Sequence, residues 1–148
     1  MKLEKITQEN WKDAIFLTTD PERVGRLDEK WVAGNAFSML QAVYDPDWDC
    51  RLLVEAGKPV GFVFYGWWRE RQKYLLCRLM IDVDYQGRGY GKKALPLAVE
   101  QMRAQFGCQD IYLSVDEENR TARHLYEAFG FVPTEEMDEK ERIYVLRG

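Results

Sequence analysis

Glycine stands at every second position of Gln86-Gly87-Arg88-Gly89-Tyr90-Gly91-Lys92-Lys93. An apolar segment from Tyr74 to Ile81 precedes this stretch. The apolar positions that follow it at helical spacing are Leu95, Ala98, Val99, Met102 and Phe106. The pattern predicts a strand, a glycine turn and a helix in that order. We expect the turn to bind an anion, because the first N–H groups of a helix have no intrahelical acceptor and meet the positive end of its dipole.

The glycine spacing excludes two common phosphate-binding loops. A Walker loop would have glycine at position 86 and Ser or Thr at position 93, where this chain has Gln86 and Lys93. A dinucleotide-binding fingerprint would have glycine in place of Lys92. The pattern that remains is Gln-x-x-Gly-x-Gly followed by lysines.

The rest of the chain reads as one αβ domain that spans residues 1–148. Expected strands are Leu3 to Ile6, Arg51 to Glu55, Val60 to Trp68, Tyr74 to Ile81, Asp110 to Val115, Phe131-Val132 and Ile143 to Leu146. Expected helices follow a cap at Thr7, start at Phe37, follow the glycine turn as far as Gly107, and run from Asn119 to Phe129. Pro96 falls in the early turns of the central helix and is expected to kink it. This order of elements predicts a mixed sheet with helices on its faces.

Composition limits the possible partners. The chain has 148 residues, 46% of them hydrophobic and 31% charged, which is typical of a soluble globular domain. The formal net charge of −4 argues against a nucleic-acid partner. The first residues contain no apolar signal region and no window is long enough to span a bilayer, so we expect a cytoplasmic protein without a membrane partner. Three cysteines and one histidine suggest neither a disulfide framework nor a metal site.

A second motif identifies a family resemblance. The segment Asn119-Arg120-Thr121-Ala122-Arg123-His124-Leu125-Tyr126-Glu127-Ala128-Phe129-Gly130-Phe131 lies one strand after the central helix. Together with the glycine stretch, it resembles the GCN5-related N-acetyltransferase (GNAT) family. The resemblance implies a mixed, mostly antiparallel sheet flanked by helices, and acetyl-CoA as co-substrate. The residues implied in cofactor binding are Ile81, Asp82, Val83, Gln86, Gly87, Arg88, Gly89, Tyr90, Gly91, Lys92 and Asn119.

The resemblance also assigns part of the chemistry. Tyr126 matches the tyrosine that protonates the departing thiolate, and a phenol with a pKa near ~10 suits that role. The base that deprotonates the amine stays open, because Cys77 and Arg78 stand where the diamine acetyltransferases have adjacent acids. Asp82 or Glu29 acting through water are the candidates. Cys77 is expected to be a buried core thiol rather than a nucleophile, and His124 is expected to be exposed and idle.

The acceptor is predicted from weaker similarities. The stretch from Cys77 to Asp82, followed by Tyr85 to Lys92, resembles the bacterial spermine/spermidine (diamine) N-acetyltransferases. A polyamine needs carboxylates and aromatic faces at the mouth of the site. The residues considered for this mouth are Asp28, Glu29, Trp31, Tyr65, Trp67, Trp68 and Asp82.

Other functions stay open. The acceptor can instead be an aminoglycoside, an amino acid or a protein amine, since a fold does not decide a substrate. A non-catalytic acyl-CoA sensor on the same fold is the alternative from another class. A homodimer that pairs through an edge strand at Ile143 to Leu146 is also considered.

Overall fold

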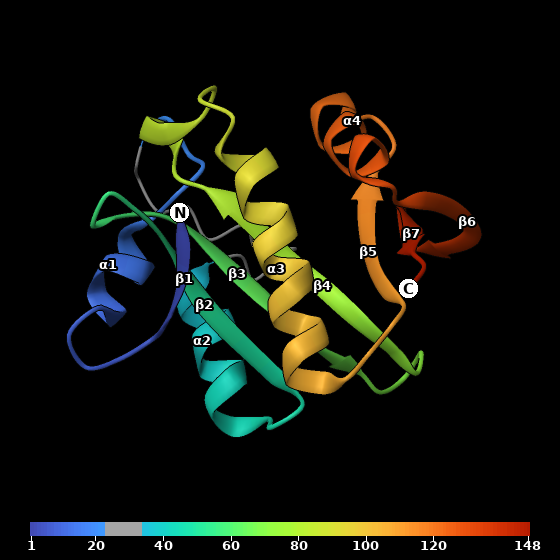
Figure 1. Cartoon of the computed structure of the whole chain (residues 1–148), viewed down its shortest axis with the longest axis horizontal. Coiled ribbons are helices and arrows are strands. Elements are labelled where there is room, and N and C mark those ends of the chain that lie inside the picture. Colours follow the sequence, from blue (N-terminus) through green and yellow to red (C-terminus); the bar gives the residue numbers. More distant parts are fainter. Residues whose placement is uncertain (23–33) are drawn as a thin grey trace.

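The computed structural model describes residues 1–22 and 34–148, and this part of the chain forms a seven-stranded sheet with helices on both faces (Figure 1). The strands are β1 (Lys2–Lys5), β2 (Trp48–Glu55), β3 (Lys58–Trp68), β4 (Lys73–Ile81), β5 (Ile111–Asp116), β6 (Val132–Asp138) and β7 (Glu141–Leu146). The helices are α1 (Trp11–Phe16), α2 (Asn35–Tyr44), the short 3₁₀ helix η1 (Val83–Tyr85), α3 (Tyr90–Phe106) and α4 (Arg120–Phe129). The strand order is β1-β2-β3-β4-β5-β7-β6. Only the β4–β5 pair is parallel, so the predicted mixed, mostly antiparallel sheet is confirmed.

Two hydrophobic clusters hold the helices on the sheet. Leu53, Tyr65, Leu95 and Met102 belong to the cluster that joins the sheet to α3, with residues of α4 packed against it. Ala14, Leu52, Phe62 and Phe64 belong to the cluster on the other face, beneath α1 and α2. Strands β2 and β3 are therefore buried on both faces, which explains their nearly continuous apolar sequence.

Helix α3 follows the prediction closely. The expected apolar positions Leu95, Ala98, Val99 and Met102 are all buried. The helix runs unbroken through Pro96 for 17 residues (Figure 1). It ends at Gly107, whose φ of 66° suits glycine and whose N–H donates to the carbonyl of Arg103 at 2.9 Å.

A gap opens between β4 and β5. The two strands are registered at Leu75 and Tyr112 and then diverge, as Figure 1 shows at their upper ends. Strand β4 keeps pairing with β3 as far as Ile81, and the register shift between Phe64 and Tyr65 leaves Cys77 as the extra residue of a β-bulge. One edge of β4 is thus left without a neighbouring strand at its carboxyl end.

Some expected features are wrong. Strand β7 lies between β5 and β6, so Ile143 to Leu146 form no sheet edge and cannot pair with a second copy. Helix α1 has Asn10 at its N-cap, while Thr7 only closes a turn by accepting the N–H of Glu9. Within the described ranges, no helix is long and apolar enough to cross a membrane.

Candidate functional site

The open edge of β4 presents backbone groups to the gap. The N–H of Asp82 donates to the carbonyl of Val60 at 2.8 Å, which fixes the alternation of hydrogen bonds along the β3–β4 pair. Hydrogen-bonded and non-hydrogen-bonded pairs alternate in an antiparallel ladder. The N–H groups of Leu79 and Ile81 therefore point away from β3 and into the gap.

The glycine turn stands at the end of this edge. Gly87 and Gly89 have φ angles of 77° and 76°, in the left-handed region that favours glycine. Gly89 is the N-cap of α3 and supplies no side-chain cap. Among the described residues, the N–H groups of Tyr90, Gly91 and Lys92 have no recorded acceptor. The start of α3 therefore offers three successive donors to an anion.

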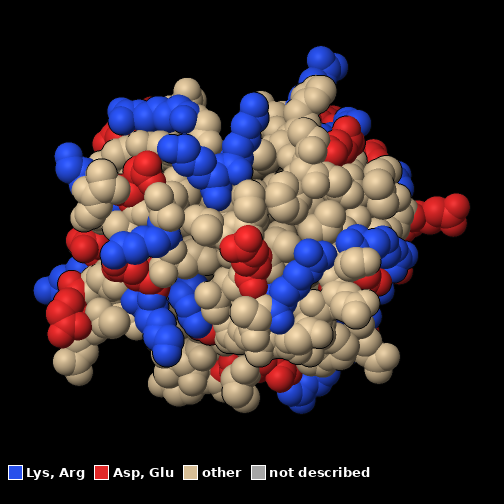
Figure 2. All heavy atoms as spheres, viewed as in Figure 1, with Lys and Arg blue, Asp and Glu red and all other residues tan. Residues whose placement is uncertain are grey.

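Side chains brace this turn and surround it with positive charge. Gln86 donates to the carbonyl of Ile81 at 3.1 Å and so ties the turn to the end of β4. Arg88 donates to the carbonyl of Asp84 at 3.1 Å and stacks over Tyr85. Figure 2 shows lysine and arginine side chains gathered at the end of the molecule where α3 begins. This field favours a polyanionic ligand.

Helix α4 closes the other side of a cavity of about 580 Å³. Its lining includes Leu79, Ile81, Gln86, Gly89, Asn119 and Tyr126. Asn119 caps α4 by accepting the N–H of Ala122 at 3.2 Å. Burial, and then the charge of Glu141, raise the pKa of Tyr126 above its ordinary value. The phenol therefore keeps its proton at neutral pH and can act as a proton donor.

Asp82 and Val83 bind other segments of the chain. The carboxylate of Asp82 is 2% exposed and accepts the N–H groups of Thr18 at 2.9 Å and Asp84 at 3.0 Å. The N–H of Val83 donates to the carbonyl of Thr18 at 2.8 Å. These groups anchor the segment after α1 to the turn, while the cofactor, substrate and base roles of Asp82 stay predictions. Of the three residues from 81 to 83, Ile81 alone lines the cavity.

The aromatic residues proposed for the mouth of the site lie elsewhere. Tyr65 is fully buried and its hydroxyl donates to Gln105 at 2.8 Å. Trp67 and Trp68 pair with Tyr74 and Lys73 at the start of β4, the end opposite Ile81. None of these three residues lines the cavity between β4 and α4, and their role in binding the acceptor stays a prediction. Asp28, Glu29 and Trp31 lie outside the described residues.

The second face of the gap is the one on the α1 and α2 side of the sheet. It carries polar residues that the sequence did not single out as a site. Ser114 of β5 donates to the carboxylate of Glu141 at 2.6 Å. Cys77 is exposed rather than buried as expected, although desolvation raises its pKa to about 11. His124 is exposed, as expected. No periodicity marks Glu141 or Ser114, because the β5–β7 register alone brings them together.

Arg78 also lies on this second face. Its guanidinium contacts the side-chain oxygen of Asn35 in α2 at 3.5 Å, and burial lowers its pKa. In the described part of the chain, no carboxylate forms an ion pair with Arg78. A partly buried arginine with only a neutral partner is expected to attract an anionic group.

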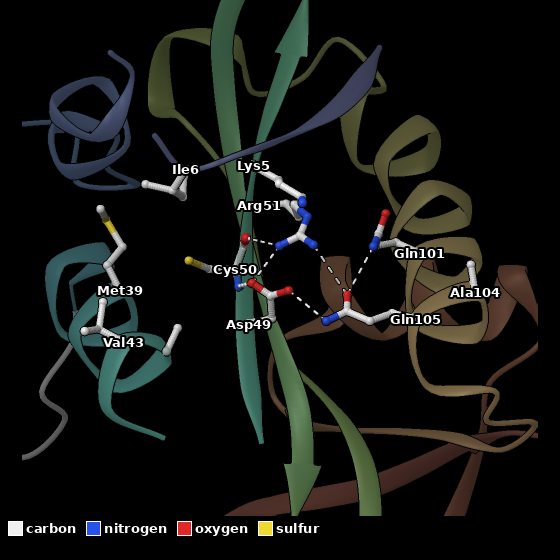
Figure 3. A pocket seen from close by; sticks show the side chains of 11 residues that line it. Lys5, Ile6, Met39, Val43, Asp49, Cys50, Arg51, Gln101, Ala104 and Gln105 are labelled. Atoms are coloured by element: carbon white, nitrogen blue, oxygen red, sulfur yellow. Dashed lines mark hydrogen bonds and ion pairs between the residues drawn. The ribbon is translucent and has the colours of Figure 1, made fainter. Parts of the chain in front are cut away.

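A larger cavity of about 740 Å³ lies at the β1–β2 side of the sheet, between α2 and α3 (Figure 3). Several of its polar groups bind one another. Arg51 pairs with Asp49 at 2.6 Å, and Gln105 donates to Asp49 at 2.8 Å. The cavity includes no residue of the glycine turn or of α4, so it is not the candidate site.

Known proteins are similar to this chain in sequence and in fold. Over 92 residues, the chain is 39% identical to the spermine/spermidine N(1)-acetyltransferase of Bacillus subtilis (strain 168). This match covers 58% of the chain and 60% of that relative. The spermidine N-acetyltransferase of Vibrio cholerae, solved with CoA and spermine, has a TM-score of 0.74 at 18% identity, covering 99% of this chain and 94% of that one. The aminoglycoside acetyltransferase AAC(6')-Ib, solved with coenzyme A, has a TM-score of 0.74 at 15% identity with the same coverage. The profile of the Acetyltransferase (GNAT) family matches residues 4–131, and the chain therefore belongs to this family.

Proposed function

We propose that this protein transfers the acetyl group of acetyl-CoA to a primary amine. The proposal depends on one observation, that the groups needed for this reaction lie together in the gap between β4 and β5. The open edge of β4, the first two of the three donors at the start of α3 and the partly buried phenol of Tyr126 line one cavity. Family membership supports the reaction type.

The residues present fit acetyl-CoA. The N–H groups of Tyr90, Gly91 and Lys92 would hold its pyrophosphate, because they are free donors at a helix N-terminus. The open edge of β4 would pair with the pantetheine arm as an added strand does. The N–H of Ile81 would polarise the thioester carbonyl, and Asn119 would contact the arm with the amide group that its cap leaves unused. The bound co-substrate supplies an activated acetyl group.

Tyr126 would give its proton to the departing sulfur. A general acid must hold its proton at the working pH and lie within reach of the leaving group. Burial raises the pKa of Tyr126, which meets the first condition. Its place in the cavity beside the end of β4 supports the second.

A polyamine is the acceptor that the relatives favour. The name of the Bacillus subtilis relative refers to spermine and spermidine, and the Vibrio cholerae structure contains spermine. The β6–β7 hairpin adds two acidic side chains, Asp138 and Glu141, within electrostatic reach of Cys77 on β4. Carboxylates are suitable partners for the ammonium groups of a polyamine.

Arg78 favours a second acceptor class, amines that also carry a carboxylate. Its guanidinium faces the α2 side of the gap and has a neutral partner in Asn35. A cation in this position repels a polyamine and attracts an amino acid. An amino-acid acceptor is therefore the second candidate.

A thiol-release assay with acetyl-CoA tests the proposal. The acceptor panel contains spermine, spermidine, putrescine, an aminoglycoside, amino acids and a peptide. Turnover of polyamines alone would support the first acceptor, and turnover of amino acids alone would replace it with the second. Tight acetyl-CoA binding without turnover of any amine would refute the enzyme and favour an acyl-CoA sensor.

A further inference from the structure

Glu141 occupies a defined place on the acceptor side of the gap. It is the first residue of β7 and lies opposite Asp116, at the carboxyl end of β5. Its side chain accepts a hydrogen bond of 2.6 Å from Ser114. Leu113 and Val115, the neighbours of Ser114 in β5, are buried on the sheet face that α3 and α4 cover. Because successive side chains of a strand point to opposite faces, Ser114 and the carboxylate of Glu141 lie on the other face of the sheet.

The charge of Glu141 is not neutralised by a neighbour. Across the hairpin it faces Asp138, whose own carboxylate pairs with Arg71 at 3.6 Å. Glu136 pairs with Lys73 at 3.3 Å, and Glu117 pairs with Arg142. Within residues 1–22 and 34–148, no lysine or arginine pairs with Glu141. This carboxylate is therefore held in place by a neutral donor, Ser114.

The groups that face Glu141 come from both walls of the gap. Its negative charge is a cause of the raised pKa of Tyr126 on α4, second to burial. It also contributes to the raised pKa of Cys77 on β4, after desolvation, and Asp138 adds to that effect. Arg78, the next residue of β4, acts on Cys77 in the opposite sense. Glu141 thus lies within electrostatic reach of the proton donor on one side and of β4 on the other.

We propose that Glu141, held by Ser114, binds the acceptor's ammonium group and takes its proton before attack. This inference rests on the proposed function and names the base that the sequence left open. The neutral amine then forms a bond to the acetyl carbon, and the carbon–sulfur bond breaks. Tyr126 passes its proton to the sulfur, and the second proton, which the nitrogen loses as the amide forms, restores the phenol of Tyr126. The products are the N-acetyl amine, CoA thiol and one proton, which leaves through Glu141.

The kinetic test compares Glu141→Gln with Glu135→Gln, an exposed carboxylate on the same hairpin. Acetyl transfer to spermine is measured as a function of pH. We expect kcat/KM of Glu141→Gln at pH 7 to fall by about 100-fold or more, the usual contribution of a general base. The loss of wild-type activity at acid pH should disappear in this variant, and Glu135→Gln should keep the wild-type profile. Wild-type rates in Glu141→Gln would overturn the proposal.

A second measurement does not depend on turnover. Cys77 is the one exposed cysteine, since Cys50 and Cys108 are buried, so alkylation by iodoacetamide reports on the gap. Removing the charge of Glu141 should lower the pKa of Cys77 and speed alkylation severalfold, whereas Glu135→Gln should not. An unchanged rate would refute the placement of Glu141. A wild-type protein that acetylates no amine, with faster alkylation of Glu141→Gln, would refute the proposed function and the base role while confirming the placement.

Discussion

Gly89→Glu should abolish CoA binding for two reasons, backbone strain and an added negative charge. The structure allows the two effects to be separated. Gly89 has a φ of 76°, so any side chain strains the backbone by roughly 1–2 kcal/mol. No heavy atom lies within 4 Å of an added Cβ, so there is no steric clash. Gly89→Ala therefore carries the strain alone. We expect it to lower Tm by about 3 to 8 °C, as a loss of this size does in a domain of this length.

The glutamate adds a charge to the same strain. Its carboxylate would stand at the N-cap of α3, where the free N–H groups of Tyr90, Gly91 and Lys92 point. A unit charge about 5 Å from a phosphate charge costs on the order of 3 kcal/mol at an effective dielectric constant near 20. This is a loss of at least about 100-fold in affinity beyond that of Gly89→Ala. High salt should reduce the difference, because it screens exposed charges.

Isothermal titration with CoA measures this difference without any acceptor. Gly57→Ala is the matched control, since Gly57 has the same φ of 76° in the turn between β2 and β3 and also has open space around it. It should lose stability as Gly89→Ala does and keep the wild-type Kd for CoA. Equal Kd values for Gly89→Glu and Gly89→Ala would refute the assignment of the anion site to the start of α3.

Four further measurements test other parts of the molecule. Tyr126→Phe should lower kcat by roughly 100-fold or more while the Kd for CoA stays near wild type, and a rate within a few-fold of wild type would show that Tyr126 is not the acid. Wild-type Cys77, with a pKa of about 11, should have on the order of one thiolate in a thousand at pH 8, so its alkylation should accelerate about tenfold per pH unit up to pH 11. Arg78→Gln should lower KM for spermine by about threefold or more by removing a like charge, and a raised KM would contradict the polyamine assignment. Asp82→Asn should cost about 1–3 kcal/mol of stability in a thermal melt, because an amide cannot accept both N–H groups that the carboxylate now accepts.

The features that the sequence predicted are local ones. The cap of α4 at Asn119, the buried stripe of α3 and the left-handed glycines before it depend on residues a few positions apart. Backbone sterics and helical periodicity are enough to predict such features. Helix α3 and helix α4 therefore have nearly the predicted bounds, whereas β6 runs from Val132 to Asp138, well beyond the expected Phe131-Val132.

The features that the sequence missed depend on contacts between distant segments. Asp82 looked like a site residue because it follows β4, but its carboxylate binds the N–H of Thr18, 64 positions away. Tyr65 looked available as an aromatic wall, but the β3–β4 register turns it towards α3 and Gln105. Ser114 and Glu141 are 27 positions apart and meet through the β5–β7 pairing. No local pattern encodes such register, so sequence reasoning could not assign these roles.

Several donors without a protein acceptor, and one carboxylate without a cationic partner in the described fold, face the same gap. The N–H groups of Leu79 and Ile81, the first amides of α3 and the carboxylate of Glu141 come from three separate segments, β4, α3 and β7. Folded proteins normally satisfy backbone donors and pair the charges that they partly bury, because unsatisfied groups cost about 1–3 kcal/mol each. Their convergence is best explained by ligands that complete them. The donors fit an anionic thioester carrier on the α3 side, and the carboxylate fits an ammonium group on the other. Under the proposed function, the two substrates would meet from opposite faces of one sheet, where β4 and β5 diverge.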